Sequence, residues 1–473
     1  MKSLENLLER IIQKVNINLR ELNFDVTPLV KNLIPLKQMG KFYALCGVTP
    51  HHPLNFNFRR SSLAGSYFLG KCRTTNSLLY KTDIRGDELK KKGDIFKYKE
   101  MEIRVTENEG IDIRNSFLIK TLVHCYSHDP ETLEKFFISN TVSTHYANIH
   151  GSPMDGCFLG PYATVDLTTT NDCVIGAYAY VQAGEIGHLE IETGTVWVRS
   201  PGLFNFLYRY PKSRLSDYIH FSAGASPKGM LIDSVDERKE DFQHVFNVVH
   251  LDHSVRIPGT TSVDRFAVIK PETHIGENVL VAQRAYLQNA YLGKGANAQE
   301  NCYIINSRLE GFNVTAHGAK IIEAGLGLNV FVGFNSFLRG RPGAKLSIGK
   351  GCIIMPHTII DIRSPLSIPE GYLVWGLVTN EAELETNSIP LAALSRITDS
   401  LIKGPMSFEG SGDAFVKAFQ DRIHHILEAN GAFFNGKNNR GHAQKNQHIS
   451  FNAIQPYPDG DLEGLYPTIS ILP

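Results

Sequence analysis

The sequence predicts a mainly β protein built around a parallel β-helix, and three observations lead to this fold class. Aliphatic residues recur at every sixth position in two long stretches of the chain. The hexads group into longer steps, each close to three hexads in length. Glycine is concentrated where the pattern is clearest, with nine glycines between Leu309 and Gly351 and none in the first 39 residues.

A period of six fits neither an α-helix, whose faces repeat every 3.6 residues, nor a strand, whose faces alternate at every second residue. It fits a coil of three short strands and three tight corners. Each aliphatic side chain then stacks on its counterpart in the coil before it, about 4.8 Å away. Glycine and asparagine supply the positive φ angles that such corners need.

The main block of coils is marked by aliphatic residues that open a hexad. They are Ile275, Leu292, Leu309, Val332 and Ile348, and all but Leu309 are followed by glycine. Three of the four steps between them are of similar length, whereas the step from Leu309 to Val332 is clearly longer. This longest step predicts an insertion between Leu309 and Val332. Leu159 and Ile175, each followed by glycine, open hexads of an earlier block.

These blocks divide the chain into five expected regions. They are an N-terminal α/β region (1–150) with an early coil fragment near 63–74, a first β-helix block (151–199), an inserted lobe (200–254), a main β-helix block (255–376), and a C-terminal helical region with an extended tail (377–473). The lobe interrupts the solenoid at a corner, where a β-helix tolerates extra residues.

Helical patterns appear at both ends of the chain and in the inserted lobe. The apolar face of an amphipathic N-terminal helix is formed by Leu4, Leu7, Leu8, Ile11, Ile12 and Val15. We expect this face to pack on the protein itself or on a sister subunit. Further helices are expected at 128–137, at a capping box of Ser234 and Glu237, at 390–397 and at 412–429. Residues 435–447 are expected to form a polar loop, and residues 456–473 an extended tail.

The composition excludes several classes of protein. The 48 Lys and Arg residues balance 48 Asp and Glu residues, so a role in coating nucleic acid or an anionic membrane is not expected. No run of 18 apolar residues is present, and we expect no membrane insertion. Seven cysteines without a C-x-x-C pair predict a reducing, cytoplasmic location and no zinc knuckle.

The hexads, together with the stretch Ile-Pro-Glu-Gly-Tyr-Leu-Val-Trp-Gly at 368–376, resemble the hexapeptide-repeat acyltransferase superfamily. The resemblance covers 159–198 and about 263–376. It implies coils that wind left-handed, a homotrimer, and transfer of an acyl group from acetyl-CoA or another acyl-CoA to an amine or hydroxyl of a sugar, sugar nucleotide or similar small metabolite. One departure weakens the acyl-CoA inference. The family usually continues with Asn-Pro-Ala and a basic residue, whereas Leu-Val-Thr-Asn-Glu follows here.

Acyl transfer needs a base that deprotonates the acceptor, and histidine suits this role because its ordinary pKa lies near neutrality. The resemblance implies such a histidine on a coil at a cleft between subunits. We select His317, because the longest step places it in an expanded coil. Asn313 and Glu323 are candidates to orient the imidazole or bind substrate, and Arg339 and Arg341 to bind a coenzyme phosphate or an anionic substrate. Each residue also has a structural interpretation, as a corner or ladder residue or a surface ion pair.

Two alternatives remain open. A non-catalytic β-helix for binding or assembly is favoured by the missing motif after residue 376. The superfamily also includes γ-type carbonic anhydrases, and His145 and His150 have the H-x-x-x-x-H spacing of a zinc-binding pair in those enzymes. These histidines precede the first clear coil, and no third histidine lies at the expected upstream distance. We therefore expect no metal.

Overall fold

The computed structural model describes residues 1–98, 100–125, 135–247, 254–454, 465 and 468–472. The chain is mainly β, with left-handed parallel β-helical coils, and it forms two compact units. Unit 1 comprises residues 1–195, 215–228 and 449–473, and unit 2 comprises residues 196–214 and 229–448. These units differ from the five expected ranges, because coils already form well before residue 151.

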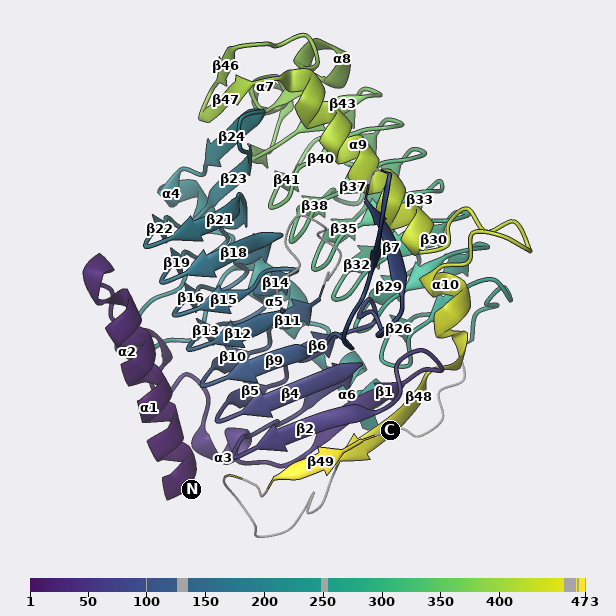
Figure 1. The fold of residues 1–473 in the computed structure, drawn as a ribbon. Coiled ribbons are helices and arrows are strands. Elements are labelled where there is room, and N and C mark those ends of the chain that lie inside the picture. The colour runs from purple at the N-terminus through teal and green to yellow at the C-terminus, as the bar shows by residue number, and fades with distance from the viewer. Residues whose placement is uncertain (99, 126–134, 248–253, 455–464, 466–467, 473) are drawn as a thin grey trace. The chain divides into compact units, whose positions relative to one another are not determined.

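Unit 1 stacks its coils into three parallel sheets, drawn as rows of arrows in Figure 1. The first contains β5 (Leu78–Tyr80), β10 (Phe117–Ile119), β13 (Val142–Ser143), β16 (Phe158–Leu159), β19 (Val174–Ile175) and β22 (Glu190–Ile191). The second contains β1 (Ala44–Val48), β3 (Ser66–Leu69), β6 (Asp83–Arg85), β11 (Leu122–His124), β14 (Asn148–His150), β17 (Thr164–Asp166) and β20 (Tyr180–Gln182). The third contains β2 (Asn55–Arg59), β4 (Lys71–Thr75), β9 (Ile111–Arg114), β12 (Phe137–Ser139), β15 (Met154–Asp155), β18 (Thr168–Asn171) and β21 (Gly184–Gly187).

Strands β3 and β4 lie where an early coil fragment was expected, near 63–74, and they pair within the second and third sheets. Two C-terminal strands close the edges of unit 1: β48 (Ser450–Ile454) pairs antiparallel with β1, and β49 (Ile469–Ile471) pairs antiparallel with β2. A hairpin of β7 (Ile95–Tyr98) and β8 (Met101–Arg104) leaves the coils between β6 and β9. Most of the helix expected at 128–137 lies outside the described residues, and Phe137 begins β12.

The expected N-terminal helix is confirmed as α1 (Lys2–Asn18). All six residues of its predicted apolar face are buried. They pack in one cluster with Leu78, Phe117, Val142, Phe158 and Val174 from the first sheet, and Figure 1 shows α1 alongside these strands. The helix therefore covers the outer face of its own β-helix. Of the two expected partners, the protein itself and a sister subunit, it packs on the first. Short turns of η1 (Leu19–Leu22), α2 (Thr27–Val30) and α3 (Leu36–Met39) follow it.

Unit 2 repeats the three-sided coil. One side contains β25 (Ser262–Val263), β28 (Leu280–Val281), β31 (Asn297–Ala298), β34 (Val314–Thr315), β37 (Phe331–Val332), β40 (Ile353–Ile354) and β43 (Tyr372–Val374). The next contains β26 (Val268–Ile269), β29 (Tyr286–Gln288), β32 (Tyr303–Ile305), β35 (Lys320–Ile322), β38 (Phe337–Arg339), β41 (Ile359–Asp361) and β44 (Leu377–Val378). The third contains β27 (His274–Ile275), β30 (Tyr291–Leu292), β33 (Arg308–Leu309), β36 (Ala324–Leu326), β39 (Leu346–Ile348) and β42 (Leu366–Ile368). The inward aliphatic residues of the three sides form one buried core.

The insertion predicted between Leu309 and Val332 is wrong. Leu309 pairs in register with Leu326, and Leu326 pairs with Ile348, so an ordinary coil step is followed by a longer one on this side. Val332 belongs to another side of the coil. The extra residues lie between β38 and β39, where Arg341 and Ala344 form an isolated bridge. An aliphatic residue followed by glycine marks corners on two sides of the coil, and this similarity caused the false alignment.

The inserted region forms β23 (Thr195–Ser200), β24 (Phe204–Arg209), α4 (Lys212–Leu215), α5 (Met230–Asp236) and α6 (Lys239–Asn247). Helix α6 packs on one side of the unit 2 coils, because the ring of Phe242 lies 6.0 Å from those of both Tyr286 and Tyr303. The predicted capping box is wrong. Ser234 lies inside α5, where its hydroxyl donates to the Leu231 carbonyl and caps no helix.

The C-terminal helices agree with the sequence pattern. Helix α9 spans Gly412–Ala429 as expected and is capped by Ser411, and α8 (Leu391–Leu394) falls within 390–397. The region also holds α7 (Glu381–Thr386), β45 (Ser388–Pro390), β46 (Ser400–Lys403), β47 (Met406–Gly410), α10 (His442–Lys445) and η2 (Asn446–His448). The polar stretch at 435–447 thus ends in helix. In the part of the chain that the structure describes, no helix combines the length and hydropathy needed to cross a bilayer.

Candidate active site

His317 lies in the turn that joins β34 to β35 in unit 2. The next residue, Gly318, has a φ of 76°, and a Cβ at this position would collide with the Asn335 side chain of the following coil. Glycine is therefore required in this turn. The Gly318 amide donates to the Glu300 carbonyl of the coil before, and the His317 carbonyl accepts from the Asn335 amide of the coil after. These bonds fix the turn between its two neighbours.

The same register places Glu300, His317 and Phe334 at one turn position of three successive coils. His317 Nδ1 lies 2.7 Å from a Glu300 carboxylate oxygen, and the ring centroids of His317 and Phe334 are 5.3 Å apart. His317 is 3% exposed and Glu300 is 5% exposed. A carboxylate at Nδ1 favours the tautomer with its proton on that nitrogen, which leaves Nε2 to accept a proton. This arrangement has the chemistry of a general base.

A buried amine lies three residues beyond His317. Lys320 Nζ donates to the Gly318 carbonyl at 2.8 Å and lies 4.9 Å from the centroid of the Tyr303 ring. Burial lowers the pKa of Lys320 to about 8, because removal from water disfavours the ammonium form. At neutral pH the side chain is still mostly cationic. It can supply positive charge beside the turn of His317.

The structure places Asn313 and Glu323 at two other corners of the coil. Asn313 is buried, accepts from the Gly311 amide and donates to the Gly327 carbonyl, so its amide bridges two backbone segments. Glu323 follows β35 and accepts from the Asn306 side-chain amide at 2.7 Å. His317 lies at the third corner, before β35. The geometry therefore does not bring these two candidates to the turn of His317.

Arg339 and Arg341 converge on Asp361. Arg339 makes two hydrogen bonds to its carboxylate, at 2.9 and 2.6 Å, and Arg341 makes one at 2.7 Å. Burial of Asp361 favours its neutral form, but the two guanidinium groups outweigh that effect and hold the pKa of the carboxyl below its ordinary value. Arg339 pairs in register with Ile322, so this ion-pair cluster lies beside Glu323. Two cations facing one carboxylate leave an excess positive charge there.

Comparisons with known proteins agree with the coil architecture. A family described as hexapeptide repeat including loop matches residues 101–223. A crystal structure from Desulfovibrio desulfuricans G20, described as a "putative acetyltransferase", is 50% identical, covers 100% of this chain and 99% of its own, and has a TM-score of 0.92. The chain belongs to the hexapeptide-repeat acyltransferase superfamily. The resemblance inferred from the hexads is thereby confirmed.

Two other solved structures align over shorter parts of the chain. A hexapeptide transferase family protein from Anaplasma phagocytophilum is 16% identical and covers 35% of this chain and 90% of its own, with a TM-score of 0.22. The UDP-N-acetylglucosamine acyltransferase from Campylobacter jejuni is 13% identical and covers 63% and 84%, with a TM-score of 0.14. No curated protein matches the chain.

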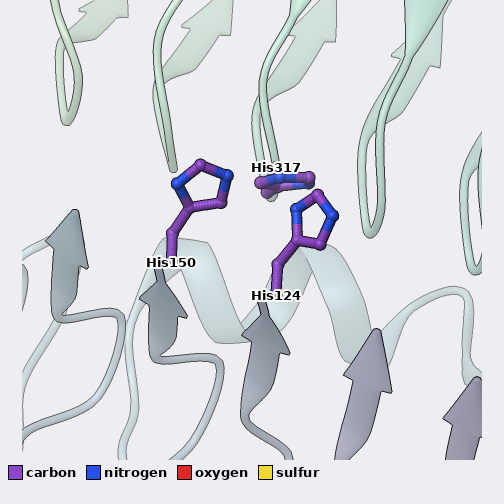
Figure 2. Close-up of side chains that lie close together, drawn as sticks. All are labelled: His124, His150 and His317. Carbon is purple, nitrogen blue, oxygen red and sulfur yellow. The ribbon is translucent and has the colours of Figure 1, made fainter. Parts of the chain in front are cut away.

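Unit 1 of this hexapeptide-repeat protein holds a second group of histidines. His124 and His150 end the neighbouring strands β11 and β14, and Figure 2 shows their rings standing on these strand ends, with His317 labelled in its own turn. The ring centroids of His124 and His150 are 5.1 Å apart. His150 Nδ1 lies 2.8 Å from Asp166, and His124 Nε2 lies 3.6 Å from Asp87. Each imidazole therefore has a carboxylate beside it.

His145 and His150, which have the spacing of a zinc-binding pair, lie at opposite ends of one strand. His145 lies in the turn before β14, whereas His150 is the last residue of β14. His150 instead shares its face of the sheet with His124. The sequence reasoning missed His124, Asp87, Asp166 and Glu300. A coil alignment extended before residue 151 would have placed His124, His150 and Asp166 at one register position.

Proposed function

We propose that this protein transfers an acyl group from acetyl-CoA or another acyl-CoA to an amine or hydroxyl of a sugar, sugar nucleotide or similar small metabolite, with His317 as the general base. The observation that supports this proposal most strongly is the buried contact between His317 Nδ1 and Glu300. Burying an imidazole that must carry a charge during the reaction costs free energy unless a carboxylate lies beside it to stabilise that charge. The pair is suited to accept a proton at Nε2 and later release it.

The proposed reaction conserves its protons. Nε2 of His317 accepts the proton of the acceptor N–H or O–H while the nucleophile attacks the thioester carbonyl. The tetrahedral intermediate then expels the coenzyme A sulfur, and the imidazolium returns its proton to this thiolate. Glu300 stabilises the imidazolium in between. The ammonium of Lys320 favours negative charge that develops near the turn.

We further propose roles for the other candidate residues. Arg339 and Arg341 are suited to bind a coenzyme phosphate or an anionic substrate, since Asp361 neutralises only one of their two charges. Glu323, at another corner, is suited to bind a part of the substrate away from His317, whereas Asn313 supports the coil by bridging two backbone segments. A homotrimer in the cytoplasm is the expected state, in keeping with the superfamily and with seven cysteines that are all buried thiols.

The direct test is a thiol-release assay with acetyl-CoA and a panel of amino sugars and sugar nucleotides. Removal of a general base typically lowers the rate by 10²- to 10⁴-fold, so we expect about a 10³-fold lower kcat for His317→Ala. His145→Asn is the matched control, because His145 occupies the equivalent turn position in unit 1, and we expect it to keep activity. If the wild-type protein binds no acyl-CoA and His317→Ala changes nothing, the proposal fails and a binding or assembly role replaces it.

A metal-dependent reaction is the second candidate, and it rests on His124 and His150. Their ligand nitrogens lie within 4.8 Å of each other, and each ring has a carboxylate beside it, as metal-binding histidines commonly do. Metal analysis of the purified protein tests this candidate. Zinc at one equivalent per chain that is lost in His150→Ala would support it. A metal-free protein with full acyltransferase activity would remove it.

A further inference from the structure

The outward face of one side of unit 2 carries a stack of planar groups. His274, Tyr291 and Arg308 occupy the same register position on β27, β30 and β33. The His274 and Tyr291 rings are 4.6 Å apart and only 11° from parallel, and the Arg308 guanidinium lies 3.7 Å from the Tyr291 ring centroid. Two stacked rings and a guanidinium over the second ring thus follow one another along the solenoid.

The stack ends at a glycine. Gly325 on β36 pairs in register with Arg308, and its φ is not positive. A Cβ built at Gly325 would meet no atom within 4 Å. The backbone conformation therefore does not require glycine, and a strand disfavours it. Its effect is to leave open the next position of the stack.

A groove of about 370 Å³ occupies this place. It is lined by Gly325 and Ser347, which follow each other in register, and by Arg308, Lys350 and Glu370. Lys350 has no ion-pair partner among the described residues, and Arg308 has Glu310 at 3.6 Å. A volume of this size suits a small organic ligand. The groove offers hydrogen-bond donors and acceptors around the open space over Gly325, here called the seat.

We propose that this groove binds a nucleobase, with the ring seated over Gly325 and stacked on the Arg308 guanidinium. Arginine presents a flat cationic face that stacks on aromatic rings, and proteins use such faces to hold unpaired bases. Ser347, Lys350 and Glu370 supply partners for the polar edges of the base. An aliphatic ligand would leave these polar groups unpaired. The inference depends on the groove alone and not on the role of His317.

Calorimetric titration of the full-length protein with adenosine, guanosine and uridine tests the proposal, with ribose as the ligand that lacks a base. We expect at least one nucleoside to bind and ribose not to bind. The decisive variant is Gly325→Val, which fits the strand and the free space but fills the seat. We expect at least tenfold weaker binding with an unchanged circular dichroism spectrum and unchanged oligomeric state.

Arg308→Lys keeps the charge but removes the flat face, and we expect about fivefold weaker binding. Lys294→Ala removes an exposed cation elsewhere in unit 2 and is the control. Comparison of ADP, coenzyme A and UDP then separates an adenine-bearing source of the base from a uracil-bearing one. The proposal is overturned if no nucleoside binds better than ribose, if Gly325→Val binds normally, or if Gly325→Val changes only the oligomeric state. The thiol-release assay of His317→Ala is a separate measurement, so either proposal can fail without the other.

Discussion

His145 in unit 1 and His317 in unit 2 occupy the same position of the coil, yet their surroundings differ. Each lies in the turn before a strand of the second side of its coil, each precedes a residue with positive φ, and each is buried, at 5% and 3% exposure. The carbonyl of each accepts from the next coil in the same way. The preceding coil brings Lys120 towards His145 and Glu300 towards His317.

The difference shows that the side chain supplied by the preceding coil sets the electrostatic surroundings of a histidine in such a turn. Burial and the charge of Lys120 together lower the pKa of His145 to about 3, so this imidazole is neutral at pH 7 and a poor proton acceptor. The neighbour of His317 is instead the Glu300 carboxylate, 2.7 Å from Nδ1. One substitution in the adjacent coil should therefore convert one type of turn into the other.

The largest effect is expected for Glu300→Lys, which gives His317 the kind of neighbour that His145 has. The new ammonium opposes formation of the imidazolium, and we expect kcat to fall by about 10³-fold or more in the thiol-release assay. Glu300→Gln preserves the shape without the charge, and a loss between tenfold and 10³-fold is expected. Both variants should retain the wild-type circular dichroism spectrum. Full activity of a folded Glu300→Gln variant would show that the carboxylate is not part of the proposed mechanism.

The importance of Glu300 could have been recognised from the sequence. It precedes His317 by one coil step, the same spacing that pairs Tyr303 with Lys320 in register. The false alignment at Val332 hid this relation, because it suggested that His317 lay in an expanded coil. The catalytic role of His317 stays a prediction, but the reason for choosing it has changed. A regular coil with a charged neighbour replaces an irregular coil as the argument.

The coils before residue 151 were harder to recognise for a different physical reason. The glycines of the later aliphatic–glycine pairs, such as Gly160 and Gly276, are needed because a Cβ there would collide with the backbone of the next coil. The earlier coils hold Ile119 and Thr144 at the position of Gly160, so the aliphatic–glycine signal is missing from them. Helices α1 and α9 were predicted closely, because an amphipathic face and a cap are local signals. The contacts of Arg339 and Arg341 with Asp361 join successive coils and follow only from coil register.

The next largest expected effect is a loss of folding stability at acid pH, caused by His145 in unit 1. The folded pKa of His145 is about 3, whereas its ordinary value is 6.5. As the pH falls below 6.5, the unfolded chain binds a proton before the folded one does, so the stability that His145 contributes decreases. The loss should approach about 4 kcal/mol near pH 3. We expect His145→Asn to lower the sensitivity of the urea unfolding midpoint to pH between 6.5 and 3. Equal pH dependence in both proteins would contradict a buried, neutral His145.

Lys320 gives a smaller effect of the same direction in unit 2, at higher pH. Its folded pKa is about 8 against an ordinary 10.5. Between these values the unfolded chain holds more protons, so stability should increase as the pH rises, by about 3 kcal/mol in total. Lys320→Met has no such titration. We expect the difference in urea midpoint between wild type and Lys320→Met to change across pH 8 to 10.5, and a constant difference would refute a depressed pKa at this site.

The smallest effect is expected for Lys120→Met, and it separates the two causes that act on His145. Burial is the larger cause of its lowered pKa, and the charge of Lys120 is the second. Removing the charge while keeping the length of the side chain should raise the pKa of His145 only slightly, as followed by NMR of the imidazole protons. Lys14→Met alters an exposed lysine of α1 and is the control. A return to about 6.5 in Lys120→Met would instead mean that the neighbouring charge dominates burial in this turn.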